Sequence, residues 1–227
     1  MTIKMNRIIF DIETAGEEWD ELDKESQKYL MRFAKTRPEK KLEKQRLALY
    51  PLTAEIICIG MLNPDTNKGA VCYRTPEFSG QQEFIDGNIN YVSGSEIKIL
   101  ERFWQAIKHY QQFITFNGRA FDCPFLLTRS AILGARATKN LMPYRYSADT
   151  HIDLLEQLTF YGAGRKFSLD FYCKVFGIES PKSHGITGLD VPRLFREGRT
   201  LEVAKYCAGD LQATKELYQR WKDSISF

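Results

Sequence analysis

The chain has 227 residues, of which 43% are hydrophobic and 27% are charged, and its formal net charge is +3. This composition is typical of a globular protein and excludes a low-complexity or fibrous chain. No apolar run approaches the ~20 residues of a membrane-spanning helix, so we expect no membrane partner, and the net charge is too small to indicate nucleic-acid binding by itself.

The first predicted element is a strand over "RIIFDIET", residues 7–14, because its apolar residues are β-branched or aromatic. Asp11 and Glu13 are two positions apart, so a strand points both carboxylates to one face, with Cα atoms roughly 6.6 Å apart. The exposed acidic face of an edge strand is the ordinary interpretation of such a pair. The strand begins close to the N-terminus, which lacks the long apolar core of a secretory signal, and this favours a cytoplasmic protein.

A long charged stretch follows from about residue 15 to residue 54, and we expect two helices in it with a break near Pro38. Basic side chains outnumber acidic ones within residues 20–46. A solvated helical face is the ordinary interpretation of these charges, and a clamp for a single-stranded nucleic acid is the alternative.

The middle of the chain predicts strands and helices in alternation. "EIICIGML" (55–62) and "GAVCYRT" (69–75) are typical of two strands joined by a turn-rich hairpin loop. Apolar residues at steps of four, four and three predict an amphipathic helix over 95–112. "FITFNG" (113–118) then predicts a fourth strand, and "DCPFLLTRSAILG" (122–134) predicts a helix.

The remainder of the chain is predicted to be helical, with helices at residues 151–162, 168–177, 189–198 and 200–223. Strands that come first and helices that alternate with one more strand predict an α/β fold with a mixed sheet. We expect strands 1–3 to be antiparallel, the further strands to be parallel and helices to flank the sheet. A single domain is expected over residues 1–227, with 15–54 as a helical insertion within it.

Acidic residues recur at two further places where packing does not require them. Asp122 falls at the start of a predicted helix, where an N-cap is the ordinary role of an aspartate. Tyr206 and Asp210 are four residues apart on the last helix, so their side chains lie on one face with Cβ atoms ~5–6 Å apart. A tyrosine at the core edge beside a solvated acid is the ordinary interpretation of that pair.

Three motifs nevertheless follow one another in a fixed order: D-x-E on the first strand, N-x-x-x-F-D after a middle strand and Y-x-x-x-D on the last helix. Their acids and tyrosine are Asp11, Glu13, Asp122, Tyr206 and Asp210. This constellation resembles the DEDD superfamily of 3′–5′ exonucleases, in its tyrosine branch (DEDDy). It is similar to the stand-alone predicted exonucleases that are related to the proofreading domain of family-B DNA polymerases. The histidine branch would need H-x-x-x-x-D, and its histidine position is Lys205 here.

The resemblance implies a ribonuclease H-like fold and a proofreading-like activity on the 3′ end of single-stranded nucleic acid, on DNA more than on RNA. The expected products are nucleoside 5′-monophosphates. The resemblance also implies two Mg²⁺ or Mn²⁺ ions per site, with Asp11, Glu13, Asp122 and Asp210 as ligands and Asp122 acting through water. Tyr206 is expected to orient the attacking water. Oxygen ligands suit these ions, and the five cysteines and three histidines show no zinc-site spacing.

Substrate contacts are also implied by the resemblance. In related enzymes the backbone just after D-x-E meets the terminal 3′-hydroxyl, which points to Thr14 and Ala15 here. Asn117 and Phe121 match positions that face the substrate strand, although Phe121 is equally suited to be a core aromatic. Basic residues close to the third motif (Arg165, Lys166 and Lys182) could contact phosphates, although surface charge is the ordinary interpretation of a basic loop.

Two other hypotheses belong to different classes of protein. One is a catalytically idle module on the same fold that binds nucleic acid or protein, which the loss of a metal ligand would favour. The other is a generic α/β protein with an acidic face, for which all three spacings are coincidences. All four acids are present, so the sequence favours the exonuclease.

Overall fold

The computed structural model describes residues 5–75, 82–180 and 185–226, and within these residues seven strands form one mixed sheet. The order of the strands is β4-β5-β3-β2-β1-β6-β7. The strands are β1 (Arg7–Gly16), β2 (Ala54–Leu62), β3 (Gly69–Arg74), β4 (Glu83–Asp86), β5 (Ile89–Gly94), β6 (Gln112–Thr115) and β7 (His151–Asp153). Pairing is antiparallel for β1–β2, β2–β3 and β4–β5, and parallel for β1–β6, β3–β5 and β6–β7. The α/β class and the antiparallel arrangement of the first three strands are therefore confirmed.

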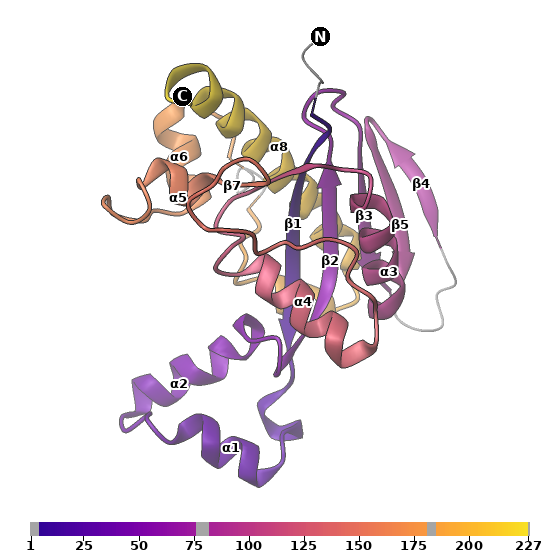
Figure 1. Ribbon diagram of the computed structural model, residues 1–227. Coiled ribbons are helices and arrows are strands. Elements are labelled where there is room, and N and C mark those ends of the chain that lie inside the picture. The colour runs from indigo at the N-terminus through magenta and orange to yellow at the C-terminus, as the bar shows by residue number, and fades with distance from the viewer. Residues whose placement is uncertain (1–4, 76–81, 181–184, 227) are drawn as a thin grey trace.

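Helices cover both faces of the sheet (Figure 1). They are α1 (Lys24–Met31), α2 (Arg37–Arg46), α3 (Glu96–Ile107), α4 (Asp122–Leu133), α5 (Leu154–Leu158), α6 (Leu169–Phe176), α7 (Val191–Arg196) and α8 (Thr200–Ser224). Two short 3-10 segments, η1 (Trp19–Glu21) and η2 (Leu47–Leu49), flank α1 and α2. Among the described residues, no helix combines the length and the apolar character that crossing a membrane requires.

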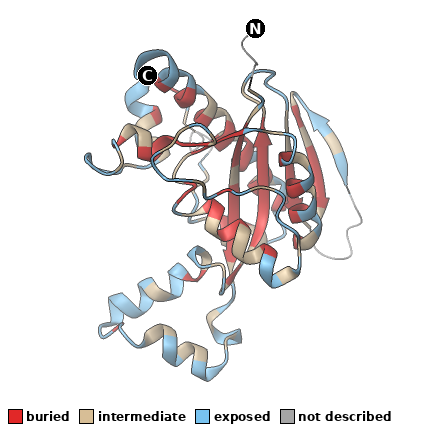
Figure 2. Ribbon diagram, in the orientation of Figure 1, coloured by how far each residue is buried: buried red, intermediate tan, exposed pale blue. Residues whose placement is uncertain are grey.

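β1 lies in the middle of the sheet and is buried on both faces (Figure 2). Ile9 and Ala15 belong to the apolar cluster that contains α8, whereas Ile8, Phe10 and Ile12 belong to the cluster on the opposite face with α3 and α4. This follows from the period of two along a strand. Because β1 pairs with β2 and β6, the interpretation of its acids as an exposed edge-strand face is wrong.

Glycine at position 60 lets α8 approach the sheet next to the acidic pair. Gly60 pairs with Asp11 across β1 and β2. A Cβ atom at this position would lie 2.7 Å from the Cys207 Sγ and 2.8 Å from the Leu211 Cδ1. Any side chain here would therefore push α8 away from β1, and with it the acid that α8 carries.

The sheet has more strands than the sequence predicts. β4 and β5 were not predicted, and the helix predicted over 151–162 is wrong in its first part, because residues 151–153 form the edge strand β7 beside β6. The helical part is α5, which begins at Leu154. The predicted break near Pro38 falls slightly earlier, since Pro38 lies in the first turn of α2, where a missing backbone N–H is tolerated.

Residues 17–53 form a helical lobe at the end of β1, and α1 and α2 project from the sheet (Figure 1). Neither helix contains a buried residue (Figure 2). The lobe is nevertheless fixed at its base. The Thr14 hydroxyl donates to the Ala48 carbonyl at 2.6 Å, and a Cβ on Gly16 would lie 2.6 Å from the Ala48 nitrogen. The segment 47–49 is thus packed against the end of β1.

Candidate active site

Three carboxylates meet where α8 crosses β1. Asp11, Glu13 and Asp210 each offer a ligand oxygen, and these oxygens lie within 4.8 Å of one another. Asp11 and Glu13 are on the face of β1 that α8 covers, and Asp210 is on the turn of α8 that passes Gly60. The first and third sequence motifs, which are far apart along the chain, therefore lie together.

The pairing of β1 with β2 is irregular beside these acids. Glu13 pairs with Cys58 but Thr14 pairs with Ile56, so Ile57 is an extra residue in β2. Ile57 and Cys58, although consecutive, both belong to the apolar cluster that contains α8. Bulges of this kind increase the local twist of a strand and are frequent next to active sites. Here the bulge sets the register at which β1 leaves the sheet toward the helical lobe.

Asp122 joins this group from the opposite side of β1. The helix-capping interpretation of this residue is wrong, because Asp122 is the first residue of α4 and Phe121 is the N-cap, with no side-chain capping bond. The Asp122 Oδ1 instead accepts a hydrogen bond of 3.0 Å from the backbone N–H of Ile12, the residue between the two acids of β1. Asp122 is not one of the three residues whose oxygens lie within 4.8 Å of one another.

The acids are costly to ionise in this place. Burial, followed by the charges of Asp122 and Asp210, raises the pKa of Asp11 well above its ordinary value. Burial and the Asp210 charge do the same to the pKa of Glu13. Burial also raises the pKa of Asp122 to about 7, in spite of the hydrogen bond from Ile12. Two charges ~5 Å apart repel by about 3 kcal/mol at an effective dielectric of 20, so a cation among these groups would be strongly favoured.

Tyr206 lies one turn before Asp210 on α8 and lines the same hollow as Asp11 and Asp210. Burial, followed by the negative charges of Asp210, Glu13 and Asp11, raises the pKa of its phenol far above the ordinary value. The hydroxyl therefore keeps its proton at neutral pH. It can donate one hydrogen bond and accept another, but it cannot act as a phenolate base.

Two adjoining hollows open above these residues. The first, which we call the acidic hollow, has a volume of about 250 Å³ and is lined by Asp11, Phe116, Ser168, Leu169, Asp170, Gly188, Tyr206 and Asp210. The second, the end hollow, has a volume of about 440 Å³ and is lined by Glu13, Thr14, Ala48, Leu49, Phe121, Thr187, Gly188 and Leu189. Gly188 borders both, so the two hollows adjoin, and together we call them the cleft over β1.

The structure distributes the predicted substrate residues unevenly around this cleft. Thr14 and Phe121 line the end hollow. The Phe121 ring also packs on Phe125, with ring centroids 5.4 Å apart, so it makes core contacts, and its contact with a substrate strand stays a prediction. Ala15 is buried in the core cluster that contains α8. Asn117 lies in the turn between β6 and α4 with a φ of 63°.

The basic residues predicted near the third motif are only partly described. Arg165 and Lys166 are exposed in the loop between α5 and α6, whereas Lys182 lies outside the described residues.

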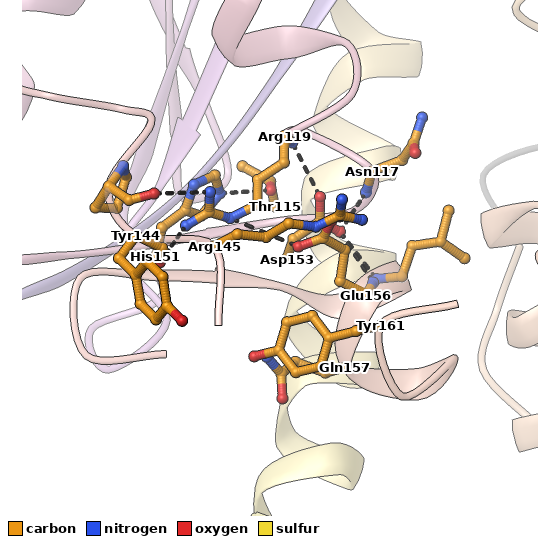
Figure 3. Close-up of polar contacts among 12 residues, drawn as sticks. Thr115, Asn117, Arg119, Tyr144, Arg145, His151, Asp153, Glu156, Gln157 and Tyr161 are labelled. Atoms are coloured by element: carbon orange, nitrogen blue, oxygen red, sulfur yellow. Dashed lines mark hydrogen bonds and ion pairs between the residues drawn. The ribbon is translucent and has the colours of Figure 1, made fainter. Parts of the chain in front are cut away.

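The turn that carries Asn117 is held by Asp153, which is also the N-cap of α5. The Asp153 carboxylate is 2% exposed and accepts hydrogen bonds of 2.9 Å from the backbone N–H groups of Asn117 and Arg119 (Figure 3). It also accepts from the N–H groups of Leu155 and Glu156 at the start of α5, at 3.0 and 3.4 Å. One buried carboxylate thus joins the second motif to β7 and α5.

Arg119 extends this support to the segment before β7 (Figure 3). Its guanidinium is buried and donates to the carbonyls of Pro143 and Tyr144 at 3.0 and 3.2 Å. Glu156 forms ion pairs with the Arg119 Nε at 3.6 Å and with the Arg145 guanidinium at 2.7 Å. The chain around the second motif is therefore a rigid frame.

Removal of the Asp153 carboxylate should destabilise this frame. In Asp153→Ala the partly buried N–H of Asn117 and the buried N–H of Arg119 lose their acceptor, and each unsatisfied buried group costs about 1–3 kcal/mol. We expect the free energy of unfolding, measured by urea denaturation, to fall by at least about 2 kcal/mol. The matched control is Asp149→Ala, an exposed acid in the preceding loop, with an expected change within about 0.5 kcal/mol. Equal effects of the two substitutions would contradict the framing role.

The donor set of the cluster fits a hard divalent cation. Asp11, Glu13 and Asp210 offer carboxylate oxygens only, which suits Mg²⁺ or Mn²⁺. Cys207 also lies beside Asp11, with its Sγ 3.9 Å from the Asp11 Oδ2. Its thiol is unsuited as a ligand, because the hydrogen bond to Cys58 and burial raise its pKa well above the ordinary value. The group can therefore hold a metal ion through oxygen alone.

Comparison with known protein families gives one match over most of the chain. Residues 70–224 match the model of a family described as predicted 3′–5′ exonucleases related to the exonuclease domain of PolB. This range contains the second and third motifs and leaves β1, with Asp11 and Glu13, outside it. A comparison with curated proteins gives no match.

Proposed function

Because the chain belongs to the family of predicted 3′–5′ exonucleases related to the exonuclease domain of PolB, we propose that it hydrolyses phosphodiester bonds at the 3′ end of single-stranded nucleic acid. The products are nucleoside 5′-monophosphates. The observation that carries this proposal is the meeting of Asp11, Glu13 and Asp210 within 4.8 Å, because β1 lies outside the matched range and yet supplies two acids to the site. DNA is the favoured substrate, in keeping with the relation to PolB.

The residues of the site have separate proposed roles. Asp11, Glu13 and Asp210 would hold divalent ions, with Asp11 as the central ligand and Asp122 taking part through water. When bound, such ions supply the charge that activates water and stabilises the negative charge that develops on phosphate. Tyr206 keeps its proton and orients the attacking water by a hydrogen bond, while the acids of the site accept the proton that the water gives up.

The shape of the cleft supports an end-directed reaction. The end hollow begins at Glu13 and is bounded by Ala48 and Leu49 of the segment packed against the end of β1. Its volume of about 440 Å³ suits one nucleotide. We assign the terminal nucleotide to this hollow, with its 3′-hydroxyl toward the backbone of Thr14 and Ala15, and with Asn117 and Phe121 beside the strand. The scissile phosphate then lies over Asp11.

The domain organisation follows from the same arrangement. We propose that residues 1–227 act as one exonuclease domain in which 15–54 is a helical insertion. The base of the lobe supports this, because Ala48 and Leu49 line the hollow assigned to the terminal nucleotide. In this proposal the insertion contributes to the site and belongs to the same domain.

The direct test uses the purified chain with 5′-labelled single-stranded DNA, single-stranded RNA and duplex, each with Mg²⁺, Mn²⁺ or a chelator. We expect metal-dependent shortening of single strands from the 3′ end, with release of nucleoside 5′-monophosphates and faster degradation of DNA than of RNA. A circular single strand should resist. Binding of these strands without hydrolysis would instead identify an idle binding module, and cleavage of the circle would contradict an end-directed reaction.

Tyr206→Phe should separate chemistry from metal binding. Loss of the hydroxyl removes the group that orients the attacking water, and we expect kcat to fall by roughly 10²-fold. The affinity for Mn²⁺, measured by titration calorimetry, should stay within twofold because the acids are unchanged. Tyr218→Phe on the same helix is the control, since Tyr218 is buried against Trp221 at 6.1 Å. Unchanged turnover in Tyr206→Phe would remove the assigned role.

A further inference from the structure

A pair of stacked rings, one of them exposed, lies next to the acidic hollow. Phe167 and Phe171 are parallel within 14°, with ring centroids 4.6 Å apart, and Phe171 is 46% exposed. The Arg165 guanidinium lies 5.1 Å from the Phe167 centroid. The exposed Phe171 ring, with a cation beside its stacked partner, offers a flat apolar surface for another aromatic group.

The loop that leads to these rings is held in place by its own hydrogen bonds. Phe160 and Tyr161 have φ values of 50° and 57°, which is unusual for bulky residues. The Tyr161 hydroxyl accepts a hydrogen bond of 2.8 Å from Gln157 (Figure 3), and the N–H of Gly164 donates to the Thr159 carbonyl at 2.9 Å. Backbone strain of this kind persists where the surrounding contacts maintain it, and such strain is concentrated at functional sites.

The stacked rings are continuous with the cleft. Ser168 and Leu169, which stand between Phe167 and Phe171 in the sequence, line the acidic hollow together with Asp11 and Asp210. Tyr172 links the rings to the acidic hollow. Its ring centroid lies 6.4 Å from that of Phe167 and 5.8 Å from that of Phe116. Phe116 is itself a wall of the acidic hollow. The rings therefore begin where the acidic hollow ends.

Cations lie beside the rings. Residues 165–171 contain two cations, Arg165 and Lys166, and one acid, Asp170, which lines the acidic hollow. Both cations are exposed. Stacking surfaces interleaved with cations suit a single-stranded nucleic acid, whose bases stack without regard to sequence and whose phosphates attract Arg and Lys.

We propose that Phe167 and Phe171 form a platform for the nucleotides upstream of the scissile phosphate, with Arg165 and Lys166 on their phosphates. The inference rests on the proposed function. If the terminal nucleotide occupies the end hollow and the scissile phosphate lies over Asp11, the rest of the strand leaves through the acidic hollow toward these rings. The substrate is then recognised over several nucleotides by stacking, and not by base sequence.

The test compares substrates of different length. The platform cannot contact the methyl ester of thymidine 5′-monophosphate, which has no aromatic group upstream of its phosphate, but it contacts a ten-nucleotide strand of dT or rU. In Phe171→Ala we expect the KM for both strands to rise about fivefold to a hundredfold, with kcat at saturation unchanged. Hydrolysis of the small ester should not change. Val175→Ala, an exposed position on the same helix, is the control for folding and should leave all values unchanged.

A second variant tests the cations independently. Arg165→Ala should raise the KM for the strands and reduce the slope of log KM against log salt by about 0.7, the value of one phosphate contact on a single strand. If Phe171→Ala affects the small ester and the strands equally, or affects neither, the platform is refuted while the exonuclease stands. If the unaltered chain hydrolyses neither substrate, the proposed function itself fails.

Discussion

Asp11→Asn should abolish metal-dependent release of nucleotides and at the same time raise the melting temperature of the metal-free protein. Asparagine keeps the size of the side chain and removes its charge. Asp11 is the acid that stands beside all the others, because the charges of Asp122, Asp210 and Glu13 each raise its pKa. The carboxylate that catalysis needs is thus one whose ionisation destabilises the metal-free fold.

The two effects of this substitution have separate physical causes. Loss of a shared ligand removes the positive charge that stabilises the reaction, and we expect kcat to fall by about 10³-fold or more. In the metal-free protein, loss of one charge relieves repulsion of about 3 kcal/mol per close pair at an effective dielectric of 20. A gain of 1 kcal/mol corresponds to about 2–4 °C in a chain of this size. The melting temperature in chelator should therefore rise by several degrees.

Asp20→Asn provides the matched control, because Asp20 is an exposed acid in η1 of the lobe. It should change neither turnover nor melting temperature. Wild-type turnover in Asp11→Asn would contradict the site, and an unchanged melting temperature in chelator would contradict the electrostatic account of it. Circular dichroism at 222 nm provides the melting curves, and release of labelled mononucleotide provides the rates.

The parts of this molecule that the sequence predicts are those with a strong local pattern. Period and spacing alone predict three of them: the D-x-E pair on β1, the start of α4 at Asp122, and the four-residue spacing of Tyr206 and Asp210. A catalytic role did not follow from any one of these motifs, since each is also compatible with an ordinary structural role. Only their order along the chain, which resembles a known family, predicted that they meet.

The parts that the sequence did not predict depend on contacts between distant residues. β7 has three residues and is a strand only because it pairs with β6, so its sequence was merged with the helix that follows. Asp153 caps the start of α5, which is a local role, but its bonds to Asn117 and Arg119 span more than thirty residues. The spacing of two places Asp11 and Glu13 on one face of β1. It could not show whether β1 lies at the edge or in the middle of the sheet, because both kinds of strand can carry this pattern.

Removal of divalent metal should destabilise the protein, and more strongly at pH 8 than at pH 5.5. The Asp122 carboxyl has a pKa of about 7 in the folded chain, against about 3.9 in an unfolded chain. Between these values the unfolded chain has released its proton and the folded chain has not. Stability of the metal-free protein therefore falls as the pH rises from about 4 to about 7, and the full penalty is present above 7. The raised pKa values of Asp11 and Glu13 act in the same direction.

A bound cation reverses this penalty, because it binds the ionised carboxylates and competes with protons for them. The rise in melting temperature on addition of Mn²⁺ or Mg²⁺ should consequently be several degrees at pH 8 and small at pH 5.5. The rate of nucleotide release should fall as the pH is lowered from 8 to 5.5. Asp11→Asn supplies the control, since the metal-dependent rise in its melting temperature should be largely lost at both pH values. A rise of equal size at pH 5.5 and pH 8 in the unaltered chain would mean that the ion binds elsewhere, because only ligands that exchange protons in this interval couple its binding to pH.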